Sequence, residues 1–163
     1  MKRILIAIDD KSTSAIVADA GHLLAKAING QTMLLHVIAD SPFYSSLDYS
    51  PVMGFQGFST AIDRVEYQDL ERVAHIHLHK IKRRLKEEKI TTLVKQGNIA
   101  DTIVKTAVEL DADMIVMGKN LKHGLQKWLN GSISEKVMRE SRTPLLIVPT
   151  QSLNAEIGLA RLQ

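Results

Sequence analysis

The sequence predicts an α/β fold: one open domain in which five short, buried, parallel strands alternate with helices. Its apolar runs are short and almost continuous, as in strands that are covered on both faces. Segments with apolar residues at helical spacing separate these runs, which is typical of an open α/β sandwich. The 163 residues are enough for one domain with its own core, and no internal repeat is evident.

The first two strands are predicted at residues 2–8 and 32–38, with a helix between them. Ser12 can cap the start of this helix, and Asn29-Gly30 ends it. Strand, helix and strand with short connections form a βαβ crossover. The buried face of the helix is expected to carry the residues that recur at helical spacing: Ile16, Ala20, Leu23, Leu24 and Ala27.

The alternation continues with strands predicted at residues 91–94, 113–117 and 145–148 and with a last helix at 132–141. Gly97-Asn98 introduces the helix before the fourth strand, and Asp101 completes a capping signal for Asn98. The inner face of that helix is expected to hold Ile103, Val104, Ala107 and Leu110. A longer helix over residues 61–89 is expected to place inward Leu70, Val73, Ala74, His77, Ile81 and Leu85.

Two segments do not follow this alternation of strands and helices. Residues 40–60 mix prolines and glycines with five aromatic side chains, and a loop of this length is usually functional or mobile. It could fold over a pocket mouth or a partner, or it could be a merely variable connection. Residues 150–163 form a C-terminal tail beyond the predicted domain of residues 1–149.

Composition narrows the possible functions. The chain has no cysteine, which excludes disulfides, thiolate metal sites and cysteine catalysis. The net charge of +3 and the 4% of aromatic residues do not favour nucleic-acid binding, since no long basic tract accompanies them. No cleavable signal pattern and no apolar run of roughly 20 residues occur. We therefore expect a cytoplasmic protein without nucleic-acid or membrane partners.

The most informative segment follows the fourth predicted strand. That strand runs directly into Gly118, and a basic loop then leads to Gly131-Ser132, which opens the last helix. Glycine lets the backbone approach a phosphate, and a helix N-terminus offers free N–H donors and a positive dipole end. Residues 118–142 carry six Lys or Arg against two Glu, which would attract an anion. The loop is a candidate phosphate cradle, although Ser132 and Glu135 also match a simple capping box.

Two acids follow the first strand. Asp9 stands at its carboxyl end, where open α/β sheets bind ligands, so it could accept hydrogen bonds from a ribose or could be a turn residue. Asp10 could help to hold Mg²⁺ if phosphates supply most of the ligands, or it could repel a nucleotide.

Three histidines raise the question of a metal site. His75 and His79 lie four residues apart on one helix face, which is a ligand spacing. No carboxylate or third histidine is obviously placed to complete the site, and His77 is expected on the core side. We therefore do not predict a metal site. Catalytic triads have no spacing signal either.

Together these features resemble the universal stress protein family over residues 1 to about 149. The matching segments are ILIAIDD with Asp9, LLHVI with Val37, Gly97, DADMIVMG, the Gly131-Ser132 turn and TPLLIVP. The resemblance implies a doubly wound parallel sheet in strand order 3-2-1-4-5 with helices on both faces. It also implies a homodimer joined partly through the last strand, whose exposed edge could pair with a second copy.

Nucleotide-binding members of the family carry a glycine, two residues, a glycine, nine residues, and then glycine with serine or threonine. Gly118 matches the first glycine and Gly131-Ser132 matches the last pair, with the spacing kept. The resemblance implies Asp9 at the ribose, Val37 main-chain groups at the adenine, and Gly118, Gly131 and Ser132 at the phosphates. Leu121 replaces the middle glycine, and its side chain could weaken the phosphate contact.

The first hypothesis is a homodimeric stress-response protein that binds ATP, or a related adenine nucleotide with or without Mg²⁺, as a regulatory ligand. No pattern places a water-activating base against a phosphate, so at most weak ATP hydrolysis is expected. The second hypothesis is a nucleotide-free dimeric interaction module with a degenerate glycine loop, which Leu121 and Asp10 favour. A third, an ATP-consuming enzyme, rests on fold analogy alone.

Overall fold

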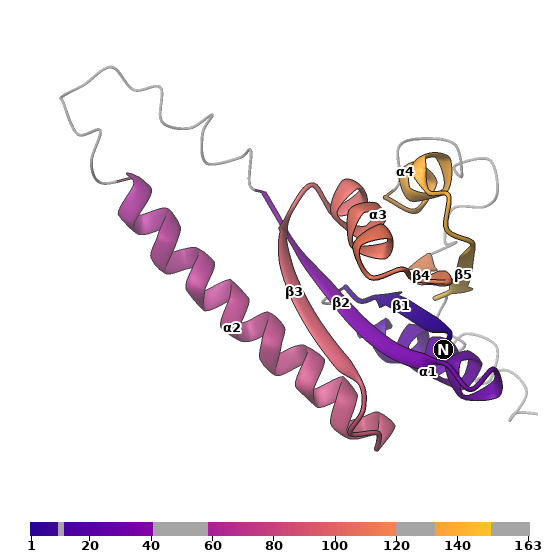
Figure 1. The fold of residues 1–163 in the computed structure, drawn as a ribbon. Helices are drawn as coiled ribbons and strands as arrows, with labels where there is room; N and C mark the ends of the chain where they lie inside the picture. Colours follow the sequence, from indigo (N-terminus) through magenta and orange to yellow (C-terminus); the bar gives the residue numbers. More distant parts are fainter. Residues whose placement is uncertain (10–11, 41–58, 120–132, 151–163) are drawn as a thin grey trace, which may run out of the picture.

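The computed structural model describes residues 1–9, 12–40, 59–119 and 133–150 and contains a five-stranded sheet (Figure 1). The sheet order is β3-β2-β1-β4-β5, and every neighbouring pair is parallel. The predicted fold class and strand order are therefore confirmed. The elements are β1 (Arg3–Ala7), α1 (Ser14–Ala27), β2 (Gln31–Ala39), α2 (Ser59–Leu85), β3 (Thr91–Gly97), α3 (Ile99–Glu109), β4 (Met114–Lys119), α4 (Ile133–Glu140) and β5 (Leu145–Pro149).

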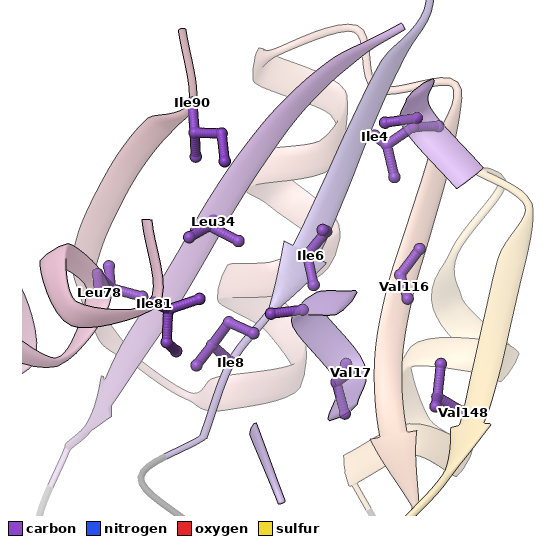
Figure 2. Close-up of a cluster of buried hydrophobic side chains, with 12 residues drawn as sticks. Ile4, Ile6, Ile8, Val17, Leu34, Leu78, Ile81, Ile90, Val116 and Val148 are labelled. Carbon is purple, nitrogen blue, oxygen red and sulfur yellow. The ribbon is translucent and has the colours of Figure 1, made fainter. Parts of the chain in front are cut away.

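Helices cover both faces of the sheet, with α1 and α2 on one side and α3 and α4 on the other (Figure 1). On the α1 and α2 face, Ile4, Ile6 and Leu34 of the sheet are fully buried (Figure 2). The chain winds outward from β1 to β3 and then returns to place β4 beside β1. The carboxyl ends of β1 and β4 therefore form the switch point of the sheet, where ligands bind in open α/β folds.

The buried face of α1 differs from the predicted one. Leu23 is 71% exposed, and Ile16 and Ala27 are exposed as well, whereas Ala20 and Leu24 are partly buried. The residues that are buried instead are Ser14, Val17, Ala18, Gly21, His22 and Ala25. The physical reason is close approach: a Cβ on Gly21 would lie 2.5 Å from Ile6 Cδ1, so only small residues fit there. A search for large apolar residues misses such a face.

The start of α1 also differs from the prediction. Thr13, not Ser12, occupies the N-cap position, and it makes no capping hydrogen bond through its side chain. By contrast, the prediction for α3 is confirmed: Asn98 occupies the N-cap and its side chain accepts a hydrogen bond from Asp101 N at 3.3 Å. Ile103 and Ala107 are buried on the inner face as expected, and Val104 and Leu110 pack against the same cluster.

The inner face of α2 was predicted only in part. Ala74 and Ile81 are buried, and Leu78, which the prediction omitted, is fully buried between them. Val73 is 59% exposed and Leu70 is 49% exposed, because this end of α2 borders a cavity instead of the sheet. None of the helices in the described ranges has the length and apolar character that a membrane-spanning helix needs.

Candidate nucleotide site

A cavity of about 1050 Å³ opens at the carboxyl ends of β1, β2 and β4. Asp9, Val37 and Gly118, which come from three different strand ends, all line it. Three of the five predicted site residues therefore line one cavity beside the switch point. Gly131 and Ser132, like Asp10 and Leu121, lie outside the described residues.

Asp9 follows β1 and is tied down through its main chain. His77 of α2 approaches the Asp9 carbonyl oxygen with Nε2 at 3.0 Å. A carbonyl oxygen can only accept a hydrogen bond, so His77 must carry its proton on Nε2. A side chain of α2 thus fixes the backbone from which the Asp9 carboxylate projects.

A second imidazole holds the preceding carbonyl. His36 of β2 lies with Nδ1 2.9 Å from the carbonyl oxygen of Ile8, and by the same reasoning it donates from Nδ1. The rings of His36 and His77 meet edge to face, with centroids 6.5 Å apart and planes at 72°. Both rings are partly buried and both border the cavity.

The His36 contact changes how the strand pairing ends. The Ile8 N–H donates to the Leu35 carbonyl at 2.8 Å, and in a regular parallel ladder Val37 N–H would next donate to the Ile8 carbonyl. The paired register instead stops at Ala7 and Leu35, and the His36 side chain donates to Ile8. The Val37 N–H is therefore outside the β1 ladder, and Val37 is one of the residues that line the cavity.

Gly118, near the end of β4, has a packing reason to be glycine. A Cβ at this position would lie 2.7 Å from Val17 Cγ2 and 2.9 Å from Thr150 Cγ2. Its φ is not positive, so a side chain is excluded by the neighbours and not by the backbone conformation. The close contact holds the end of β4 against α1, whatever ligand the cavity receives.

The side of the cavity next to α4 carries positive charge. Ile133 and Ser134, the first two residues of α4, border it together with Lys119 of β4. The N-terminus of a helix carries a partial positive charge, and a lysine adds to it. An anionic group would be stabilised at this end.

An ion pair holds α4 on α3. Lys136 Nζ lies 2.7 Å from Asp101 Oδ1, and it also reaches the N-cap side chain of Asn98 at 3.4 Å. The hydrogen bond from Lys136 lowers the pKa of the Asp101 carboxyl, and the same bond raises the pKa of Lys136. The two directions agree, as expected for one pair that favours both charged forms.

The histidines of α2 do not gather around a metal position. His75 Nε2 lies 4.0 Å from Glu71, while His77 is committed to the Asp9 carbonyl. Across the described ranges, no three His, Asp or Glu side chains converge on one point. His77, which the sequence placed on the core side of this helix, has a main-chain partner.

Sequence reasoning missed His36 altogether. Its partner, Ile8, is 28 positions away, so local patterns could not connect them. The available signal was a polar residue inside an apolar strand, since such a side chain needs a hydrogen-bond partner when it is partly buried.

The model of the "Universal stress protein family" matches residues 1–149. This chain belongs to the universal stress protein family. It is 30% identical over 149 residues to universal stress protein MJ0531 of Methanocaldococcus jannaschii, covering 90% of this chain and 81% of that protein.

Solved structures agree with this membership. The structure of MJ0577, from the same organism, matches with a TM-score of 0.68 and 26% identity, covering 93% of this chain and 97% of that one. A universal stress protein solved in complex with cAMP matches with a TM-score of 0.62 at 20% identity, over 92% of this chain and 98% of that one. One from Archaeoglobus fulgidus, in complex with dAMP, matches with a TM-score of 0.54 at 20% identity, over 90% and 97%. At these identities the last two show the shared fold.

Proposed function

We propose that this universal stress protein binds an adenine nucleotide, with ATP as the first candidate, as a regulatory ligand. The observation that carries the proposal is the meeting of Asp9, Val37 and Gly118 at one cavity. Its volume of about 1050 Å³ is near the upper end of ordinary ligand sites. The cAMP and dAMP complexes of two proteins with this fold support adenine as the base.

The nucleotide would lie along the cavity from β2 towards α4. The adenine would face the main chain of Val37, and the ribose hydroxyls would donate to the Asp9 carboxylate. Phosphates would lie towards Gly118, Lys119 and the N-terminus of α4, where positive charge favours them. Gly131 and Ser132 are proposed to complete this end, and Mg²⁺ would accompany a triphosphate.

The nucleotide is proposed to act as a ligand and not as a substrate. General-base catalysis needs a side chain that is free to take a proton from water. Both cavity histidines donate to the Ile8 and Asp9 carbonyls, which puts them at the nucleoside end of the proposed pose and away from the phosphates. Binding would act by favouring one conformation or partner over another.

A homodimer through β5 belongs to the same proposal. β5 is an edge strand, since it pairs only with β4 within the described sheet. Its outer edge carries backbone donors and acceptors that a second copy could satisfy. Analytical ultracentrifugation with and without ATP tests this assembly; a protein that stays monomeric at high concentration in both would contradict it.

A nucleotide-free interaction module remains the second candidate. Its specific support is that packing against Val17 and Thr150 already explains the glycine at position 118. Leu121 in place of the middle glycine adds to it. Under this alternative the cavity would have no nucleotide partner, and β5 would carry the function.

Calorimetric titration of nucleotide-stripped protein with ATP and Mg²⁺ distinguishes the nucleotide-binding proposal from the interaction module. The proposal predicts saturable binding at micromolar to low-millimolar ligand, loss of binding in Gly131→Val, and weaker binding in Asp9→Asn. Asp111→Asn is the matched control, because that exposed carboxylate pairs with Arg3 at the start of β1, at the opposite end of the strand from the cavity. Leu121→Gly should bind more tightly if the leucine is an obstacle. Absence of heat and of any melting-temperature change at millimolar ATP would favour the module.

A further inference from the structure

Two consecutive carbonyl groups at the end of β1 each accept a hydrogen bond from an imidazole. Ile8 O accepts from His36 Nδ1 at 2.9 Å, and Asp9 O accepts from His77 Nε2 at 3.0 Å. The donors come from different elements, β2 and α2, that lie far apart in the sequence. Such a pairing of two side chains with two successive main-chain groups fixes the path of the chain as it leaves the strand.

We propose that His36 and His77 are positioning residues for the nucleoside end of the site. Their N–H groups hold the Ile8 and Asp9 carbonyls, which orients the Asp9 carboxylate and leaves Val37 N–H available to the base. We call this pair of residues the imidazole clamp. The inference rests on the proposed function and adds two residues that contact no ligand themselves.

The clamp is built on rigid parts of the fold. His77 precedes Leu78, which is fully buried, and lies one turn after the buried Ala74. His36 lies in β2 between the buried residue Leu35 and Val37, which lines the cavity. A group held by rigid elements needs little further ordering when a ligand binds, which is the physical basis of preorganisation.

The hydrogen bonds to the two carbonyls require a different tautomer for each histidine. Because carbonyl oxygens only accept, His36 must carry its proton on Nδ1 and His77 on Nε2. Ser14 Oγ lies 3.4 Å from His77 Nε2 and can only accept from it, since that nitrogen already donates. The ligand-free protein should therefore contain one histidine of each tautomer at this place.

These tautomers define a sharp set of substitutions. A glutamine amide places its N–H near the position of histidine Nε2, and an asparagine amide places it near Nδ1. His77→Gln and His36→Asn should therefore keep the donor, whereas His77→Leu and His36→Leu remove it at similar volume. His79→Leu, at an exposed position of the same helix, is the matched control.

Loss of one main-chain hydrogen bond should weaken nucleotide binding by about 3- to 10-fold. We expect that loss for ATP and for adenosine in both leucine variants, with recovery to within about 2-fold in His77→Gln and His36→Asn. Binding of tripolyphosphate should not change, because the clamp acts at the nucleoside end. A general loss of packing would weaken the binding of ATP, adenosine and tripolyphosphate alike. His77→Gln and His36→Asn would then not restore binding.

Two results would overturn the inference. The first is leucine variants that bind adenosine as tightly as the wild type. The second is a nitrogen-detected NMR spectrum at mildly alkaline pH in which His36 is not the Nδ1–H tautomer or His77 not the Nε2–H tautomer. Wild-type protein that binds no nucleotide would instead overturn the proposed function, and the tautomers would still decide whether the clamp forms.

Discussion

Lys136 of α4 lies 2.7 Å from the carboxylate of Asp101 in the first turn of α3. This pair joins the helix whose N-terminus borders the cavity to the helix that begins after the Asn98 cap. The contact is exposed to solvent, so its role is to set the position of α4 more than to stabilise the whole fold.

Asp101 should contribute to stability in a pH-dependent way. The Lys136 hydrogen bond lowers its pKa in the folded state below the usual 3.8. The unfolded chain therefore binds the proton first, so the contribution is present above the unfolded value and is lost as pH falls through the lowered value. Asp101→Asn should flatten the acid limb of a plot of melting temperature against pH, relative to the wild type. Equal acid limbs in wild type and Asp101→Asn would contradict the role of this pair.

His22 should give a second pH dependence nearer to neutrality. Burial lowers its pKa below 6.5, with a further contribution from Lys26, and its Nδ1 lies 2.9 Å from Thr32 Oγ1. The folded state disfavours the charged form, so stability is full above 6.5 and is lost as pH falls towards the lowered value. His22→Asn keeps a hydrogen-bonding group near the position of His22 Nδ1 and removes the ionisable imidazole. Melting temperatures of this variant should fall less on mild acidification than those of the wild type or of His79→Asn.

The close contact between α1 and β1 predicts an unusual order of mutational effects. Gly21→Ala should lower the free energy of unfolding by about 1–3 kcal/mol, because the new Cβ meets Ile6 Cδ1 at 2.5 Å. Ile6→Val removes that methyl group and should reduce the cost of Gly21→Ala in a double-mutant cycle. Leu23→Ala removes a large apolar side chain, but that side chain is exposed, so the free energy of unfolding should change by less than about 0.5 kcal/mol. Denaturant unfolding measures all of these, and a larger loss in Leu23→Ala than in Gly21→Ala would refute the assigned face.

Gly118 should prove sensitive to its neighbours even without a ligand. Gly118→Ala should cost about 1–3 kcal/mol of unfolding free energy, since a Cβ would meet Val17 and Thr150. In a Val17→Ala background the added cost should be smaller, because one of the two close methyl groups is gone. If Gly118→Ala is neutral in nucleotide-free protein, the packing explanation for this glycine fails.

The sequence predicted the fold well because its strands are short, buried and separated by helices. The buried faces of α1 and α2 were harder to predict, for a physical reason. Helical spacing identifies large apolar residues, but the helix face with Ala18, Gly21 and Ala25 is buried because its residues are small. Likewise, Leu70 and Val73 are apolar and yet border the cavity.

The candidate site was predictable only to the extent that strand ends could be identified. Asp9 and Gly118 follow apolar runs, and Val37, which the family resemblance indicated, lies near the end of another, so the parallel sheet brings all three to one cavity. Hydrogen bonds between distant elements, such as His36 to Ile8 and His77 to Asp9, leave no local pattern. The ligand roles of Asp9, Val37, Gly118, Gly131 and Ser132 all remain predictions.

The amide resonance of Val37, followed by NMR during a titration with ATP and Mg²⁺, shows whether a nucleotide enters the cavity at the strand ends. We expect a saturable shift of this resonance and of the Gly118 resonance, at the same ligand concentration that produces heat in calorimetry. Resonances that stay in place at millimolar ATP, or shifts confined to residues away from the cavity, would contradict this expectation.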